Sequence, residues 1–128
     1  MPSAQGQQQV LNALARIERQ LGRMDGRLNG LEGQMKELNV RVRSGETNAV
    51  ARLWNSRATG PGQEIQPLIP MATGEAINGF PTTTTNLNGL SMARVTDILR
   101  LLEQPTGGTL NERRQRLRLV CGITMQWS

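Results

Sequence analysis

The stretch VLNALARIERQLGRMDGRLNGLEGQMKELNVRV, residues 10–42, decides how this chain folds. Its apolar residues follow one another at alternating spacings of four and three, which is the heptad pattern of a left-handed coiled coil. A helix that packs on its own domain has a wider apolar stripe, whereas the flanking positions here are polar. We name these apolar residues the seam; they are Val10, Leu14, Ile17, Leu21, Met24, Leu28, Leu31, Met35, Leu38 and Val42. The pattern predicts an oligomerising coiled coil at residues 10–54, after a disordered tail at residues 1–9.

The charged residues beside the seam predict how the helices are oriented. With Leu14 at heptad position a, Arg27 and Arg41 occupy position g, and Glu32 and Glu46 occupy position e. In a parallel, in-register pair, each g residue faces the partner's e residue five positions later in the sequence. Arg27 then meets Glu32 of the partner, Arg41 meets Glu46, and no like-charged pair arises. We therefore expect a parallel homo-oligomer of two to four copies, because the mixture of residues at a and d leaves the copy number open.

Glycines interrupt the helix outside the seam. Each costs about 1 kcal/mol relative to alanine, so four of them cost roughly 3–4 kcal/mol. An isolated helix of this composition should be mostly unfolded and should form only when the seam is buried, so that folding and assembly are one equilibrium. The four glycines are Gly22, Gly26, Gly30 and Gly33.

The middle segment, residues 55–81, loses the heptad pattern. Its prolines and glycines predict turns and extended chain rather than helix. Apolar residues such as Ile65, Leu68 and Phe80 are too numerous for a plain flexible linker. We expect this segment to form a strap across the coil or across the C-terminal unit, with a disordered tether as the alternative.

Helical signals return in residues 82–128. Ser91 can cap a helix that runs from Met92 to about Glu103, and proline and glycines then end it. Thr109 and Glu112 have the spacing of a capping box for the next helix. We expect the arginines of that helix to project mainly outward. The expected fold class is therefore all-α: a coiled coil, an extended middle segment and a small helix–loop–helix unit.

The segment LNGLSMARVTDILRLLEQPTGGTLNERRQRL, residues 87–117, resembles a SAP domain, a helix–extended loop–helix module. The match lies in the apolar spacing, in Pro105, in Gly108 and in the closing Arg116-Leu117. SAP domains bind duplex DNA, so the resemblance implies DNA contact by the loop and by the start of the following helix. The sequence departs from the family at Glu103, where glycine is usual, and at residues 109–110, where lysine is frequent. The layout is also similar to small uncharacterised proteins of filamentous fungi.

Composition narrows the chemistry that the chain can perform. The net charge of +5 comes almost entirely from arginine and favours acidic partners. With no histidine and a single cysteine, Cys121, the commonest general base and metal ligand are missing. Cys121 lies on an apolar helix face, as expected of a buried structural thiol, and Trp127 is expected to pack back on the domain. We therefore expect no enzymatic activity, cofactor, metal or small-molecule substrate.

The chain also carries no signal for a membrane or an export route. No apolar run is long enough to cross a membrane, so we expect no membrane partner. The N-terminus lacks a charged region followed by an apolar core, so a secretory signal is not expected. Together with the SAP resemblance, this predicts an intracellular, nuclear protein.

Two hypotheses for function follow from these features. In the first, several SAP-like units joined by the coil bind duplex DNA through avidity. In the second, the protein is a structural or adaptor protein whose C-terminal helices bind a protein partner, and the arginines are a solvated surface. The residues expected at a nucleic-acid interface are Arg94, Arg100, Gly107, Gly108, Thr109, Arg113, Arg114, Arg116 and Arg118.

Overall fold

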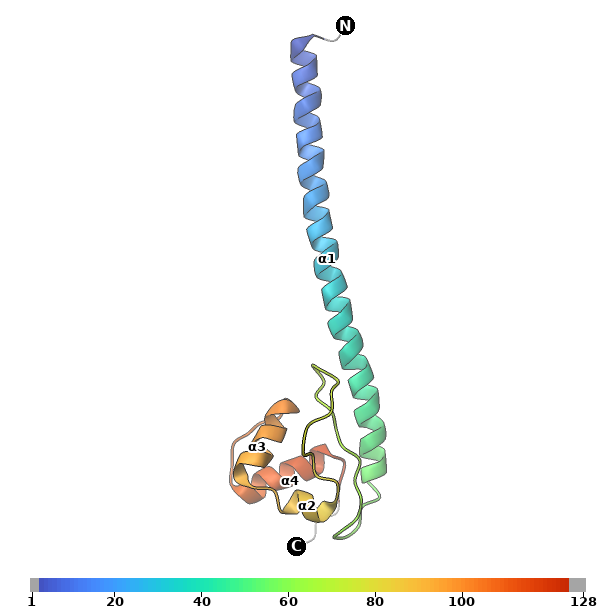
Figure 1. The fold of residues 1–128 in the computed structure, drawn as a ribbon, viewed down its shortest axis with the longest axis vertical. Coiled ribbons are helices and arrows are strands. Elements are labelled where there is room, and N and C mark those ends of the chain that lie inside the picture. Colours follow the sequence, from blue (N-terminus) through green and yellow to red (C-terminus); the bar gives the residue numbers. More distant parts are fainter. Residues whose placement is uncertain (1–2, 125–128) are drawn as a thin grey trace. The chain divides into compact units, whose positions relative to one another are not determined.

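The computed structural model describes residues 3–124, which form four helices and no strand. These are α1 (Ala4–Asn55), α2 (Thr84–Asn88), α3 (Met92–Leu101) and α4 (Leu110–Val120), as drawn in Figure 1. The prediction of an all-α fold with a long N-terminal helix is confirmed. Trp127 lies outside the described residues. The contacts divide the chain into a stem, up to Leu38, and a domain that begins at Asn39, so the last turns of α1 belong to the domain.

The start of α1 corrects one prediction. The helix begins at Ala4 and includes most of residues 1–9, which were predicted to form a disordered tail. Ser3 explains the difference, because its hydroxyl oxygen accepts a hydrogen bond from the Gly6 backbone N–H at 3.0 Å. Its carbonyl oxygen also accepts the N–H of Gln7. Ser3 therefore acts as an N-cap, and it satisfies backbone groups that the first turn leaves without a helical partner.

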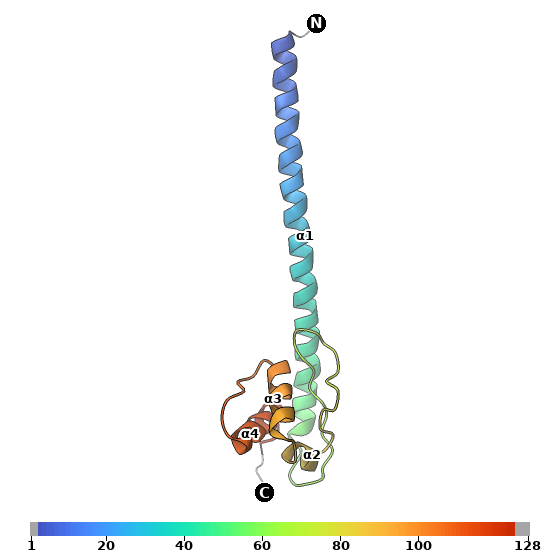
Figure 2. The same ribbon diagram turned by 60° about the vertical axis from the view of Figure 1, so that its left-hand side comes forward.

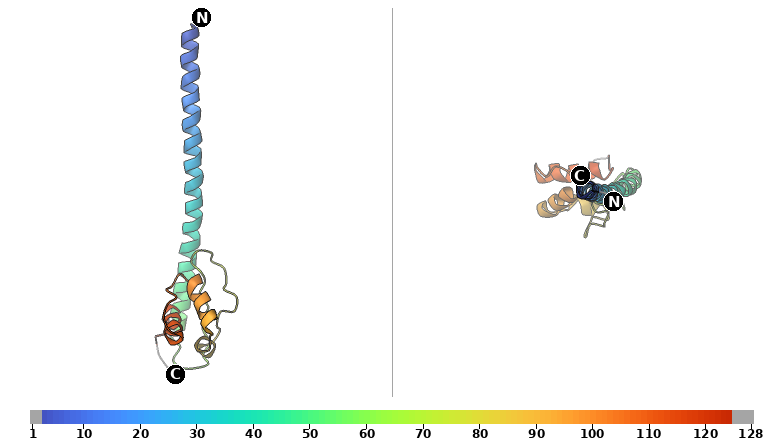
Figure 3. Two further views of the ribbon diagram at one scale, coloured as in Figure 1. Left: turned by 90° about the vertical axis from the view of Figure 1, so that its left-hand side faces the viewer. Right: turned by 90° about the horizontal axis from the view of Figure 1, so that it is seen from above.

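The core of the domain forms where α4 packs against α2 and α3. Figure 3 shows α3 and α4 next to each other in both of its views. The two helices meet through apolar faces that the sequence pattern predicts, with Ile98 and Leu117 both fully buried. Other fully or almost fully buried core residues are Ile65, Leu68, Leu87, Val95, Leu99, Cys121 and Ile123.

The middle segment packs against the final turns of α1 instead of hanging free (Figure 2). Two asparagines of α1 hold it through both atoms of their amide groups. Asn48 donates to the carbonyl oxygen of Ile69 and accepts its N–H, both at 2.8 Å. Asn55 does the same with Gln66, at 2.9 and 2.6 Å. Each pair of hydrogen bonds has the donor and acceptor pattern found between two extended strands.

The spacing of these two clamps follows from backbone geometry. Asn55 follows Asn48 by seven positions, so their side chains stand about 10.5 Å apart along the helix. Three residues of extended chain, from Gln66 to Ile69, span about 10 Å. The match keeps this stretch extended along one face of α1. The Asn55 amide also donates to the carbonyl oxygen of Cys121 at 2.9 Å, which ties the end of α4 to the same point.

The ends of α2, α3 and α4 are set by local signals. Thr83 and Ser91 cap α2 and α3 by accepting backbone N–H groups with their hydroxyl oxygens. The end of α4 has a Schellman arrangement in which Gly122 has a φ of 90°. A Cβ on Gly122 would lie 2.5 Å from the carbonyl oxygen of Arg52 in α1. Glycine is therefore required there by the backbone conformation and by the close approach of α1.

Removing the amide of Asn55 should weaken the domain more than any surface change. Asn55→Ala leaves a donor and two carbonyl oxygens in a buried place without partners, and each such group costs about 1–3 kcal/mol. We expect the free energy of unfolding to fall by about 3 kcal/mol, measured by urea unfolding followed by tryptophan fluorescence. The matched control is Asn111→Ala on the exposed face of α4, which should change it by less than about 0.5 kcal/mol. Equal losses in the two variants would contradict the clamp.

Candidate functional site

The first candidate surface is the seam of α1. Each of its ten side chains is between 50% and 64% exposed, so nothing else among the described residues covers it. Covering half-exposed apolar side chains contributes about 1 kcal/mol each, or roughly 10 kcal/mol per chain. That exceeds the roughly 3–4 kcal/mol that the glycines of the helix cost. A Cβ added at any of these four glycines would meet no atom within 4 Å, so packing inside the chain does not require them.

The second candidate surface is α4 with the loop before it. The predicted capping box is confirmed: the Thr109 hydroxyl accepts the Glu112 N–H, and the Glu112 carboxylate accepts the Thr109 N–H, both at 3.2 Å. The hydrogen bond from the Thr109 backbone lowers the pKa of Glu112 below its ordinary value. Gly107, Gly108 and Thr109 are exposed, and Gly108 has a φ of 104°.

The arginines of α4 depart from the prediction that they project mainly outward. They donate hydrogen bonds to other segments of the domain instead. Arg113 donates to the Gly108 carbonyl oxygen at 2.9 Å and to the Thr96 hydroxyl at 2.7 Å. Arg116 donates to the carbonyl oxygens of Pro105 and Gly107, at 2.9 and 2.8 Å. The loop after α3 turns these oxygens toward α4 without giving them backbone N–H partners, and guanidinium groups satisfy them.

The other two arginines hold the connection between α2 and α3. Arg114 donates twice to the Leu90 carbonyl oxygen, at 2.9 and 2.6 Å. Arg118 donates to the side-chain oxygen of Asn88 at 2.7 Å. None of the four α4 arginines forms an ion pair with a carboxylate among residues 3–124. The hydrogen bonds of these four arginines go to neutral oxygens and do not neutralise their positive charge, although Arg116 also interacts electrostatically with Glu112.

The predicted interface residues therefore fall into separate groups. Arg113 and Arg116 lie with the Gly107–Thr109 loop at the start of α4. Arg114 and Arg118 lie at the connection between α2 and α3. Arg94 lies over Gly79 of the middle segment, and Arg100 is ion-paired with Asp97 at 3.2 Å. The structure brings the loop and the first two arginines together, whereas Arg94 and Arg100 are not part of that cluster.

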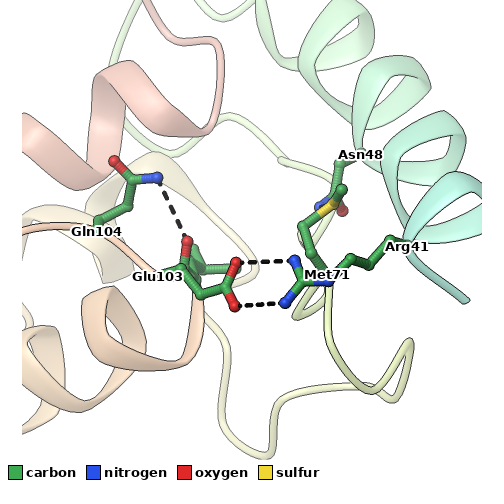
Figure 4. Close-up of polar contacts among 6 residues, drawn as sticks. Arg41, Asn48, Met71, Glu103 and Gln104 are labelled. Carbon is green, nitrogen blue, oxygen red and sulfur yellow. Dashed lines mark hydrogen bonds and ion pairs between the residues drawn. The ribbon is translucent and has the colours of Figure 1, made fainter. Parts of the chain in front are cut away.

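Arg41 of α1 has a partner within its own chain. Its guanidinium bonds both carboxylate oxygens of Glu103, at 3.0 and 3.2 Å, as Figure 4 shows. Both side chains are about half exposed. The Glu46 of a neighbouring copy, which the heptad pattern pairs with Arg41, would have to compete with this contact. The pairing with Glu103 depends on tertiary structure, so no local sequence pattern predicts it.

Glu103 holds an unusual backbone position for its residue type. Its φ of 58° lies in the left-handed region, and the N–H of Gln104 bonds the Leu99 carbonyl oxygen. This is the Schellman end of α3, where glycine is the usual residue. Glu103 stands where the SAP pattern usually has glycine. It adopts the left-handed conformation although it carries a side chain. The hydrogen bonds from Arg41, followed by its charge, lower the pKa of Glu103.

Cys121 is buried in the core of the domain. Burial raises the pKa of the Cys121 thiol to about 12, so it is protonated near neutral pH. Within residues 3–124, no three metal-ligating side chains gather in one place. None of the helices in that range is long and apolar enough to span a membrane.

No family model matches the chain, and neither a curated protein nor a solved structure is significantly similar to it.

The ion pair between Arg41 and Glu103 predicts a specific dependence of stability on pH. Because the folded-state pKa of Glu103 is lowered, its contribution is present above the ordinary glutamate pKa of about 4.3 and is lost as pH falls through the folded value. Below about pH 4.3, we expect the unfolding temperature of the wild type to fall more steeply with decreasing pH than that of Glu103→Gln.

A double-mutant cycle supplies the control for this prediction. Arg41→Gln should flatten the same part of the pH profile, and the double variant should match either single variant, because both changes remove one interaction. If Glu103→Gln and the wild type give parallel profiles across this range, the pair does not contribute to stability.

Proposed function

We propose that the protein is a non-enzymatic, self-assembling structural protein. Its seam forms a parallel coiled coil of two to four copies, and each copy displays its C-terminal domain to binding partners. The observation that carries this proposal is the uninterrupted row of ten apolar side chains, each half exposed or more in the single chain. Monomeric proteins rarely leave an apolar patch of this extent uncovered.

The charges and glycines of α1 support the same proposal. Arg27 and Glu32 occupy positions g and e, where a parallel neighbour would join them. The glycines lie on the outer positions and weaken the single helix without disturbing the contact between helices. The stem is thus built to gain its stability from association, as obligate oligomers do.

The test of self-assembly is the mass of the full chain in solution. We expect a whole-number multiple of 14.1 kDa, from two to four copies, by sedimentation equilibrium at micromolar concentration. The variant Leu21→Arg/Leu28→Arg places two charges in the seam and should sediment as a monomer. The control Ala15→Arg/Asn29→Arg adds the same two charges at outer positions and should keep the wild-type mass. A monomeric wild type, or a seam variant of unchanged mass, would refute the proposal.

Binding of duplex DNA by the displayed domains is a second candidate function. The observation in its favour is the charge on α4, where none of the four arginines forms an ion pair among the described residues. The exposed backbone at Gly107–Thr109 precedes the helix start, which is a favourable place for phosphate. Several weak contacts joined by the coil would add through avidity. The order of α2, α3, loop and α4 is compatible with the SAP resemblance, and this role would place the protein in the nucleus.

The DNA proposal is tested best by two variants that damage the loop contacts equally. Arg113→Gln/Arg116→Gln removes the charge, whereas Arg113→Lys/Arg116→Lys keeps it and removes the guanidinium fork. By fluorescence anisotropy on a labelled duplex at two salt concentrations, the glutamine variant should bind more weakly, with a salt slope smaller by about 2. The lysine variant should keep the wild-type slope. Equal binding by the two variants, or no binding by the wild type at low salt, would count against DNA contact.

A further inference from the structure

Two apolar side chains in the last turns of α1, beyond the seam, are strongly exposed among the described residues. Val50 and Leu53, in the last turns of α1, are 70% and 71% exposed, which is more than any residue of the seam. They lie within the domain, where most large apolar side chains are buried in its core. What could cover them depends on the direction in which they face.

The regular heptad cannot continue past Val42, because the domain already uses the next d positions. Gly45 would be the first of these, and a Cβ there would lie 3.4 Å from the Met71 side chain of the middle segment. Arg52 would be the second, and its Nε donates to the Val120 carbonyl oxygen at 2.9 Å. Both positions therefore contact the chain's own domain, and neither offers an apolar side chain to a second helix.

A shift of four residues restores the apolar stripe. Leu53 follows Val42 by 11 residues, which is close to three full turns, so the two side chains lie on one line along the helix. Insertions of four residues of this kind are known interruptions of heptad patterns, and they unwind the supercoil locally. In the shifted pattern Ala49 and Leu53 occupy the core positions, and Val50 lies beside them.

The opposite face of the same turns is the one that the domain covers. The buried residues of this part of α1 are Ser44, Asn48, Ala51 and Asn55. At about 100° per residue, this group points roughly half a turn away from Val42 and Leu53. The domain therefore leaves the shifted stripe open along its whole length.

We propose that the interface between copies continues past Val42 through Ala49, Val50 and Leu53, and that its occupant is a second copy of this chain. This inference rests on the proposed parallel assembly, since an in-register neighbour brings Leu53 next to its own equivalent. Each domain then packs on the outward face of its helix, so the helices associate down to their last turn. Glu46 is the charged exception within the stripe, and it makes this extension weaker than the seam.

Disulfide trapping in the full chain tests the extension and the seam separately. Leu14→Cys reports on the seam, Leu53→Cys on the extension, and Thr47→Cys is the control. Thr47 is exposed on the same turns but lies at an outer position in both the regular and the shifted pattern. The wild type supplies the background, because Cys121 is buried. Each protein is oxidised with copper phenanthroline and resolved on a non-reducing gel.

We expect Leu14→Cys and Leu53→Cys to form covalent dimers at similar rates, and Thr47→Cys to do so roughly tenfold more slowly, because a disulfide needs Cα atoms within about 7 Å. Rapid trapping at Leu14, with Leu53→Cys no faster than Thr47→Cys, would overturn the extension and leave the proposed assembly standing. Slow trapping at Leu14 as well would overturn the assembly and the extension together.

Discussion

The last turns of α1 are bound to their own domain on one side, and this constraint governs the rest of the structure. Asn48 and Asn55 hold the middle segment in an extended path, and Asn55 also holds the end of α4. Gly122 allows the turn after α4 to reach the backbone of Arg52. Because these contacts occupy one face of the helix, the other face is left for whatever associates with the chain.

The arginines of α4 illustrate how one residue type can serve structure and charge together. Their guanidinium groups satisfy carbonyl oxygens of two connections, which a small core could not hold by apolar packing alone. These bonds go to neutral oxygens, and no arginine of α4 forms an ion pair with a carboxylate among the described residues. A high arginine content is therefore no sign of a nucleic-acid site by itself, since stabilising the fold already accounts for these side chains. No other described residue covers the seam, and for that reason assembly is the better supported proposal.

Local features of the fold could be predicted from the sequence, and features that depend on distant contacts could not. The heptad stripe, the Ser91 cap and the capping box of Thr109 and Glu112 are set within a few residues of one another, so spacing alone indicates them. The asparagine clamps and the Arg41–Glu103 pair join residues 11 to 66 positions apart. No pattern within one segment identifies such partners. The direction of the α4 arginines was mispredicted for the same reason, because it depends on loop carbonyl groups contributed by other segments.

In the proposed assembly, the stem is helical because copies cover one another's seams, whereas the domain is folded within each chain. Amide hydrogen exchange, followed by mass spectrometry over a dilution series, distinguishes these two sources of order. We expect protection of residues 10–38 to fall as the protein is diluted, because the assembly dissociates and the glycine-rich helix frays. Protection of the buried amides of α3 and α4 should stay constant over the same series. Stem amides that are equally protected at every concentration, in a protein whose mass is that of a single chain, would rule out this assembly.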